Sequence, residues 1–377
     1  MAGFMDDRSV AQHVLAHISA GSTDRGADVW REPVANYQSE ERLGAELRVL
    51  RRLPTPFCPS AALPETGSFV AREAAGTPIL VVRGRDGRVR AFRNACRHRG
   101  TPLASGSGCA KALVCPYHGW TYQLDGRLQH VPHEDGFPGL DKEQRGLVPV
   151  AAEEHLGLVF VTQEQGAPVA TPWEGLRDLI APEQQLMAAK ESVLEVNWKV
   201  FLEGFIEGYH IRPAHTETFY PYGFDNLNLV EFSGPNSRVT YPFRRIEKLR
   251  ELPPQEHRVD GLLTYVYQLF PNAMLTVLSR HTNLVVLEPL AVDRTRAFNY
   301  SLTNRDGGAD AAQLAKRDAD FVGQTGAAED LALALSIQRS LGSGANEFFT
   351  FGHFEAAIVH FHRTLAAAFE AGAPEAG

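Results

Sequence analysis

Short apolar stretches separated by turn residues dominate the chain from about residue 52 to about residue 165. Ile79–Arg83 is a short apolar run, and Val89–Arg93 alternates as a half-buried strand does. Asp86-Gly87 between them is typical of a β-hairpin turn, and Asp125-Gly126 offers a second one. With the buried strand expected at Leu158–Val161, this pattern predicts a small all-β domain.

From about residue 172 onward, helical and strand patterns are mixed. Val196–Tyr209 reads as a helix, the strands that follow it are grouped, and two helices come after them. This order predicts an α+β domain in which an antiparallel sheet is covered by helices, so the chain as a whole is expected to be α+β. The expected strands are Tyr265–Leu269, Met274–Leu278, Asn283–Glu288 and Arg296–Thr303, and the later helices span about 310–323 and 327–341.

The segment 1–50 is expected to be helical and to pack on the C-terminal domain. Ser39 can cap a helix in which Leu43, Leu47 and Leu50 form an apolar stripe on one face. A polar connection containing Gly and Pro, at 163–171, marks the other boundary. The expected domains are therefore 1–50, 51–165 and 166–377.

Composition narrows the class of protein. The 377 residues are 44% hydrophobic and 22% charged, as in ordinary globular proteins, and the formal net charge of −8 gives no reason to expect nucleic acid or an anionic membrane as a partner. No apolar run approaches the length of a transmembrane helix and the N-terminus shows no signal pattern, so we expect a cytoplasmic protein without membrane contact. Cys58 and Cys109 are expected to be unpaired thiols in a reducing compartment.

Two Cys-His pairs lie in the β-patterned region, with 16 residues between them: Cys96-Arg97-His98 and Cys115-Pro116-Tyr117-His118. Each pair is short enough to occupy one loop tip. Two facing tips would present two thiolates and two imidazoles, which suits a [2Fe-2S] cluster of the Rieske kind. The alternative is a structural zinc site, but zinc fingers usually place both Cys in one knuckle and both His on one helix.

This chain resembles the Rieske non-heme iron oxygenases, specifically their catalytic α subunit or terminal oxygenase component, in two sequence motifs, Cys96–Gly100 and Cys115–Trp120. The resemblance extends into the second half of the chain, where Asn197-Trp198-Lys199 opens a stretch that ends with two histidines in register. It implies a mononuclear Fe(II) site there, with O2 as co-substrate. It also implies that the cluster ligands are Cys96, His98, Cys115 and His118.

The candidate ligands of the second metal are His210, His215 and Asp330. Pro213 disfavours continuation of the predicted helix, so His215 can bend back toward His210 and the two imidazoles can hold one metal. Taken alone, two histidines near a proline are weak evidence. A ferrous oxygenase site needs a third, anionic ligand, which the resemblance places at Glu329-Asp330. Asp330 is expected because its helical companions form the more buried stripe, namely Ala334, Ile337 and Leu341.

The resemblance further implies a head-to-tail homotrimer in which the cluster of one subunit serves the iron of its neighbour. Glu207, expected on the same helix face as His210, matches the acid that links His210 to His118 across that interface. A Glu at this position resembles homotrimers that act on quaternary amines or methoxy-aromatics. Gly204-Phe205 departs from the Asn-Tyr of many relatives, and a glycine in mid-helix suggests close packing.

The substrate pocket is expected between about residues 205 and 300, where aromatic residues are dense and could enclose a cation or stack on a ring. Isolated histidines in the second half are expected to be structural: His281, His353, His360 and His362. The aromatic candidates are Phe219, Tyr220, Tyr222, Phe224, Tyr241, Phe243, Tyr265, Tyr267 and Phe270.

The sequence therefore predicts a terminal oxygenase that hydroxylates, dihydroxylates or oxidatively demethylates a small aromatic or quaternary-amine-like substrate. It contains no flavin or nicotinamide fingerprint, so NAD(P)H is expected to act only through a separate reductase, with or without a ferredoxin. Two alternatives remain open at this point. One is a Rieske electron carrier without oxygenase activity, and the other is a zinc-stapled binding protein.

Overall fold

The structure is a computed structural model, and it describes residues 3–164, 172–177, 179–304 and 310–371. The chain divides into two compact units. The first comprises Met1–Val49 and Ala170–Gly377, and the second comprises Leu50–Val169. Most of the polar connection predicted at 163–171 lies outside the described residues, and the three-part domain assignment stays a prediction.

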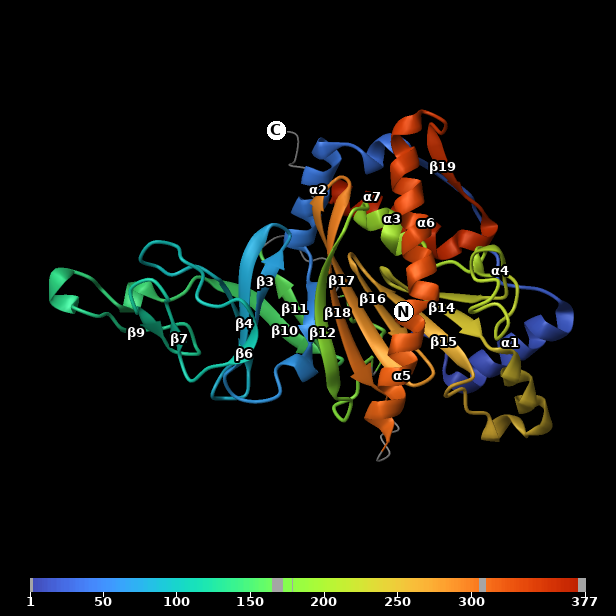
Figure 1. Cartoon of the computed structure of the whole chain (residues 1–377), viewed down its shortest axis with the longest axis horizontal. Helices are drawn as coiled ribbons and strands as arrows, with labels where there is room; N and C mark the ends of the chain where they lie inside the picture. The colour runs from blue at the N-terminus through green and yellow to red at the C-terminus, as the bar shows by residue number, and fades with distance from the viewer. Residues whose placement is uncertain (1–2, 165–171, 178, 305–309, 372–377) are drawn as a thin grey trace. The chain divides into compact units, whose positions relative to one another are not determined.

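The second unit is built from two antiparallel sheets. Its larger sheet has the strand order β2-β11-β10-β5-β4-β3-β6, and its smaller sheet has the order β7-β8-β9 (Figure 1). The predicted hairpin at Asp86-Gly87 is present, since Arg83 of β4 pairs with Val89 of β5. The strands are β2 (Thr55–Pro59), β3 (Ser68–Ala74), β4 (Thr77–Arg83), β5 (Val89–Arg93), β6 (Gly106–Cys109), β7 (Leu113–Val114), β8 (Thr121–Tyr122), β9 (Leu128–His130), β10 (Pro149–His155) and β11 (Leu158–Thr162).

The first unit contains one large antiparallel sheet with the order β12-β18-β17-β16-β15-β14-β13, and a small pair of β1 with β19. The four strands predicted between 265 and 303 are all present, each with its bounds shifted or extended by a few residues. The strands are β1 (Trp30–Pro33), β12 (Leu186–Leu194), β13 (Leu229–Ser233), β14 (Asn236–Pro242), β15 (Leu263–Leu269), β16 (Ala273–Val277), β17 (His281–Ala291), β18 (Arg294–Thr303) and β19 (Phe348–Phe351).

Helices cover the large sheet, which confirms the predicted α+β fold class. In Figure 1, α5 and α6 run one after the other across the sheet; α5 packs on β17 and β18, and α7 packs on β13 and β14. Among the described residues, no helix has both the length and the apolar character needed to cross a bilayer. The helices are α1 (Asp7–Ala20), α2 (Glu40–Arg52), α3 (Trp198–Glu203), α4 (Ile211–Ala214), α5 (Ala311–Gln324), α6 (Gly326–Ser340) and α7 (Ala356–Glu370).

The predicted helix at 196–209 is wrong in its extent, because α3 ends at Glu203. Asn197 caps its start by accepting the Lys199 N–H at 2.9 Å, and Gly204 terminates it. Gly204 is therefore an end residue rather than a mid-helix one, and an added Cβ there would meet its first neighbour only at 3.9 Å, so the expected close packing is absent. A second helix, α4, then carries Pro213 in its first turn, where the missing N–H is not needed.

A buried ion pair anchors α3 to α2. Lys199 Nζ lies 2.5 Å from Glu46 Oε1, both side chains are 1% exposed, and Glu46 Oε2 accepts the Trp198 indole N–H at 2.7 Å. Ser39 starts α2 as predicted, since its hydroxyl accepts the Arg42 N–H at 3.1 Å. The helix that leads to the two candidate metal histidines is thus fixed to the N-terminal segment by charge as well as by packing.

Replacing Glu46 with alanine is expected to lower the free energy of unfolding by about 3–5 kcal/mol, because it leaves the Lys199 ammonium buried without its carboxylate. Urea denaturation followed by circular dichroism measures the change. Glu41→Ala, on the exposed face of the same helix, is the control and should change stability by less than about 0.5 kcal/mol. Equal effects of the two substitutions would contradict the assigned role of the pair.

Candidate metal centres

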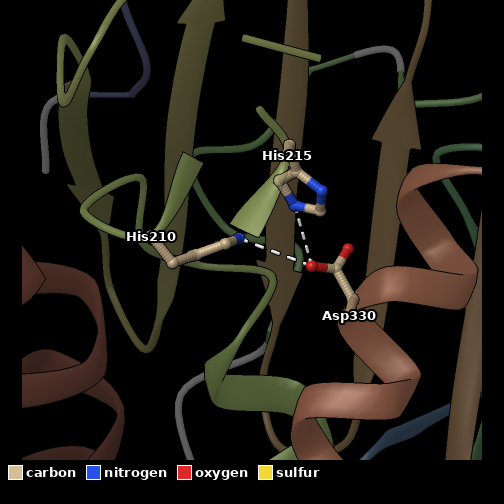
Figure 2. A group of neighbouring side chains, drawn as sticks. All are labelled: His210, His215 and Asp330. Atoms are coloured by element: carbon tan, nitrogen blue, oxygen red, sulfur yellow. Dashed lines mark ion pairs between the residues drawn. The ribbon is translucent and has the colours of Figure 1, made fainter. Parts of the chain in front are cut away.

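His210, His215 and Asp330 come together from two separate parts of the first unit. His210 precedes α4, His215 follows it, and Asp330 projects from α6 (Figure 2). Asp330 Oδ1 lies 2.9 Å from His215 Nε2 and 3.5 Å from His210 Nε2, and each residue offers one ligand atom within 4.8 Å of the others. Two imidazoles and one carboxylate on one side of a point form the facial set typical of non-heme iron oxygenases.

The surroundings of these atoms favour a cation between them. His215 Nε2 is buried and faces Asp330 Oδ1 at 2.9 Å, without a hydrogen bond of regular geometry between them, so that the two atoms are placed to share a cation. Burial alone lowers the pKa of His210, but the hydrogen bonds to Asp330 and Glu207 outweigh it and raise that pKa to about 10. Burial lowers the pKa of His215 as well, but Asp330 and Glu329 outweigh it and raise that pKa, while the two histidines lower the pKa of Asp330 despite its burial. A divalent metal supplies this positive charge while both rings stay neutral.

Two further carboxylates orient the two imidazole rings through their Nδ1 atoms, on the side away from Asp330. Glu207 accepts the hydrogen of His210 Nδ1, and Glu329 accepts that of His215 Nδ1 at 2.7 Å while also accepting the Thr218 hydroxyl at 2.6 Å. Each ring thereby presents its Nε2 to the shared point, as outer carboxylates do for metal-bound histidines. The sequence pattern did not reveal this role of Glu329 or Thr218.

Geometry favours Asp330 over Glu329 as the ligand, and the predicted difference in burial between their two helix faces is confirmed, except at Ile337. Ala334 and Leu341, on the face of Asp330, are buried while Ile337 is 43% exposed, whereas the face of Glu329 carries Leu333, Ser336 and Ser340, which are all exposed. What distinguishes the two acids is which nitrogen of His215 they meet. The metal-ligand assignment therefore rests on contacts that helical periodicity does not encode, and it stays a proposal.

The predicted contact between Glu207 and His210 exists, but not on a helix face. Both residues lie in the turn between α3 and α4, and the Glu207 carboxylate also accepts the backbone N–H of His210 at 3.2 Å. This turn folds the acid against the ring. The spacing of three residues between Glu207 and His210 correctly predicted their contact, but the contact is formed in a turn and not on a helix.

Close packing of α6 supports the site. Phe219 lies against His215, with ring centroids 4.9 Å apart, and a Cβ on Gly326 would fall 2.0 Å from the Phe219 ring. Only glycine lets the start of α6 approach this closely. Since Asp330 lies one turn further along α6, this contact sets how near the carboxylate comes to the histidines.

A cavity of about 370 Å³ opens from the three candidate ligands into the first unit. Five of the predicted aromatic residues line it, while Tyr265 and Tyr267 line a larger neighbouring groove and Phe270 packs against Phe361. His281 also lines the cavity, so it has a place in the site that its sequence context did not indicate. The aromatic lining consists of Phe205, Phe219, Tyr222, Phe224, Tyr241, Phe243 and Phe321.

In the second unit, the two Cys-His loops share one backbone design. The Gly100 N–H donates to the Cys96 carbonyl at 2.9 Å, and the Gly119 N–H donates to the Cys115 carbonyl at 3.0 Å. Both glycines have positive φ, +81° and +73°, which explains the Gly that follows each pair. Each loop thus turns back on its cysteine, and both cysteines are buried in the core of the unit.

The histidines of the two loops lie together at the edge of that core. The rings of His98 and His118 have centroids 4.8 Å apart, His98 stacks on Trp120, and His98 Nδ1 is buried without a hydrogen-bond partner. Burial lowers the pKa of His98, which favours the neutral ring that a metal ligand requires. The four side chains do not form a ligand group for a single ion, whereas the described residues at 210, 215 and 330 do. Two thiolates and two imidazoles from two such loops suit a two-iron cluster of the Rieske kind.

The remaining two thiols differ sharply in reactivity. Burial raises the pKa of Cys58 to about 12, whereas Cys109 is exposed, and neither forms a disulfide. We therefore expect a maleimide to label the intact native holoprotein at Cys109 alone, and all four thiols after denaturation and removal of iron. Peptide mass spectrometry identifies the sites, and Cys109→Ser should remove native labelling. Labelling of Cys58 in the native protein would contradict this prediction.

Comparison with known proteins follows the same division of the chain. The family model described as "Ring hydroxylating alpha subunit (catalytic domain)" matches residues 183–371, and the model "Rieske [2Fe-2S] domain" matches residues 54–146. The carnitine monooxygenase oxygenase subunit of Acinetobacter pittii is 31% identical over 299 residues, covering 74% of this chain and 76% of its own.

Two solved structures share the fold. The quaternary ammonium Rieske monooxygenase CntA superposes with a TM-score of 0.76 at 24% identity, over 91% of this chain and 96% of its own. Naphthalene 1,2-dioxygenase from Rhodococcus sp. superposes with a TM-score of 0.77 at 18% identity, over 97% and 99% of the two chains.

Proposed function

Because the chain belongs to the Rieske ring-hydroxylating oxygenases, as a catalytic α subunit, we propose that it is the terminal oxygenase for a small quaternary ammonium compound. Membership makes the protein an oxygenase with a Rieske [2Fe-2S] cluster and a mononuclear iron that uses O2. The cluster supplies electrons and the mononuclear iron activates oxygen. The two alternatives, an electron carrier and a zinc-stapled binding protein, are thereby excluded.

We assign the mononuclear iron to His210, His215 and Asp330, and the cluster to Cys96, His98, Cys115 and His118. The approach of Asp330 Oδ1 to Nε2 of both histidines and the convergence of the three ligand atoms support the first assignment. The matched loops and the buried, unpartnered Nδ1 of His98 support the second. The chain's own contribution to the chemistry is to hold these rings in one tautomer through Glu207 and Glu329.

The aromatic cavity is the observation that carries the substrate proposal. Seven phenylalanine and tyrosine rings contribute to its walls together with the three candidate ligands, and the face of an aromatic ring attracts a cation that has lost its water. A volume of about 370 Å³ suits a small molecule. The name of the Acinetobacter relative, carnitine monooxygenase, points to the same class of substrate.

The proposed reaction is a monooxygenation. One atom of O2 enters a C–H bond of the substrate and the other leaves as water, with two electrons and two protons supplied from outside the chain. We propose that a separate flavin reductase, with or without a ferredoxin, passes these electrons from NAD(P)H. We also propose a homotrimer with electron transfer between subunits, and the exposure of His118 at the edge of its unit is compatible with such a contact.

The test is oxygen consumption coupled to product formation by the iron-loaded protein with an added reductase. The panel is L-carnitine, γ-butyrobetaine, glycine betaine, choline and naphthalene. We expect one product per O2 with at least one quaternary ammonium compound and none with naphthalene. Coupled turnover of naphthalene and of no quaternary ammonium compound would contradict the proposal and indicate an aromatic substrate.

A further inference from the structure

One arginine lies where the cavity meets the larger groove. Arg245 lines both spaces, as do Ser279 and Asp318, whereas the three candidate metal ligands line the cavity alone. The groove has a volume of about 1660 Å³ and belongs to the same unit. Arg245 therefore stands where the cavity meets the groove.

Its guanidinium is fixed by neutral acceptors. Nε donates to the Gly261 carbonyl at 2.7 Å, Nη2 donates to the same carbonyl and to the Ser279 hydroxyl at 2.9 Å, and the group lies 4.8 Å from the centre of the Phe243 ring. Nη1 has no hydrogen-bond partner among the described residues. The arginine is thus held in place with donors to spare.

No carboxylate neutralises this charge within the part of the chain that the structure describes. Other arginines of the unit have acidic partners, such as Arg238 with Glu231 and Arg212 with Asp225. The acid at the same opening, Asp318, accepts from His281 Nδ1 at 2.8 Å and from the Arg280 N–H at 3.1 Å. Arg245 is also the one arginine or lysine among the described residues that line the cavity.

We propose that Arg245 binds an anionic group of the substrate, so that the substrate is a zwitterion or anion whose reacting carbon lies beside the three candidate metal ligands. A planar guanidinium with free N–H groups matches a carboxylate, and Ser279 adds a hydroxyl beside it. This inference deepens the proposed function, on which it rests for the identity of the reacting end. It adds that a quaternary ammonium substrate carries a carboxylate as well.

The test compares carboxylates with their methyl esters by isothermal titration calorimetry on the iron-loaded protein. The ligand pairs are γ-butyrobetaine and its methyl ester, and 3-phenylpropionate and its methyl ester. We expect the wild-type protein to prefer the carboxylate in at least one pair. Arg245→Gln should weaken binding of that carboxylate by about 10–100-fold and leave the ester within about twofold. The affinity of Arg245→Lys for that carboxylate should lie between those of the wild-type protein and Arg245→Gln.

Arg244→Gln is the matched control, because Arg244 adjoins Arg245 in sequence and is exposed as Arg245 is, but it does not line the cavity and reaches it only through the ring of Phe224, 5.3 Å away. Arg244→Gln should leave the preference for the carboxylate over its methyl ester unchanged in each pair. No preference for carboxylate in the wild-type protein, or equal effects of Arg244→Gln and Arg245→Gln, would overturn the proposal. A preference confined to 3-phenylpropionate, lost in Arg245→Gln, would support the role of Arg245 while refuting the quaternary ammonium function.

Discussion

Replacing Asp330 with alanine is expected to abolish oxygenation while leaving the visible spectrum of the cluster unchanged. The substitution removes the anionic member of the triad, whereas the four cluster ligands lie in the other unit. Iron should fall from about three to about two atoms per chain, since only the mononuclear ion is lost. Turnover should drop by more than about 100-fold, which exceeds the usual effect of an outer-shell change. Iron analysis, absorption spectra and coupled oxygen uptake measure the three quantities.

Glu329→Gln is the matched control for Asp330→Ala. Glu329 is the adjacent acid on α6, touches the same histidine and is more exposed, with 35% of its side chain accessible against 15% for Asp330. It should retain the third iron and lose about 10–100-fold in activity, because only the orientation of His215 is disturbed. If Asp330→Ala kept its full iron content and turnover, the ligand assignment would be wrong, and Glu329 would be the next acid to examine.

The two metal centres differ in how far the sequence alone could define them. The cluster loops are local, so the spacing of Cys96, His98, Cys115 and His118 carries nearly all of their geometry. The second site joins residues more than a hundred positions apart, and no local pattern says which nitrogen of His215 meets which acid. The resemblance to a family supplied that link, while helical periodicity identified the more buried helix face correctly and misjudged only the exposure of Ile337.

The predicted helix at 196–209 is too long for two physical reasons. Apolar spacing continues past Glu203, but Gly204 ends α3, and the Glu207 carboxylate then accepts backbone N–H groups in the turn before α4. Arg244 and Arg245 illustrate a similar limit. Two adjacent arginines look alike in sequence, and only the fold separates the one that lines the cavity from the one that does not.

Replacing Glu207 with glutamine is expected to slow turnover by at least about 100-fold with all three iron atoms still bound. Glutamine keeps the shape of the side chain but is a weaker acceptor for His210 Nδ1, so the ring is less firmly held. If Glu207 also links His210 to His118 of a neighbouring subunit, as proposed, electron transfer from the cluster slows as well. Stopped-flow absorbance of the reduced cluster, mixed with O2 and substrate, measures that step directly.

Glu329→Gln separates the two roles of Glu207. Glu207 and Glu329 are equivalent with respect to the rings they orient, since each accepts from an Nδ1, but Glu329 also bonds Thr218 and has no proposed link to the cluster. If Glu207 only orients His210, the cluster should be reoxidised at similar rates in Glu207→Gln and Glu329→Gln. A relay through Glu207 requires reoxidation to slow at least about tenfold more in Glu207→Gln than in Glu329→Gln. Equal rates in the two variants would reduce Glu207 to a residue that positions His210 and would remove the support for electron transfer through it.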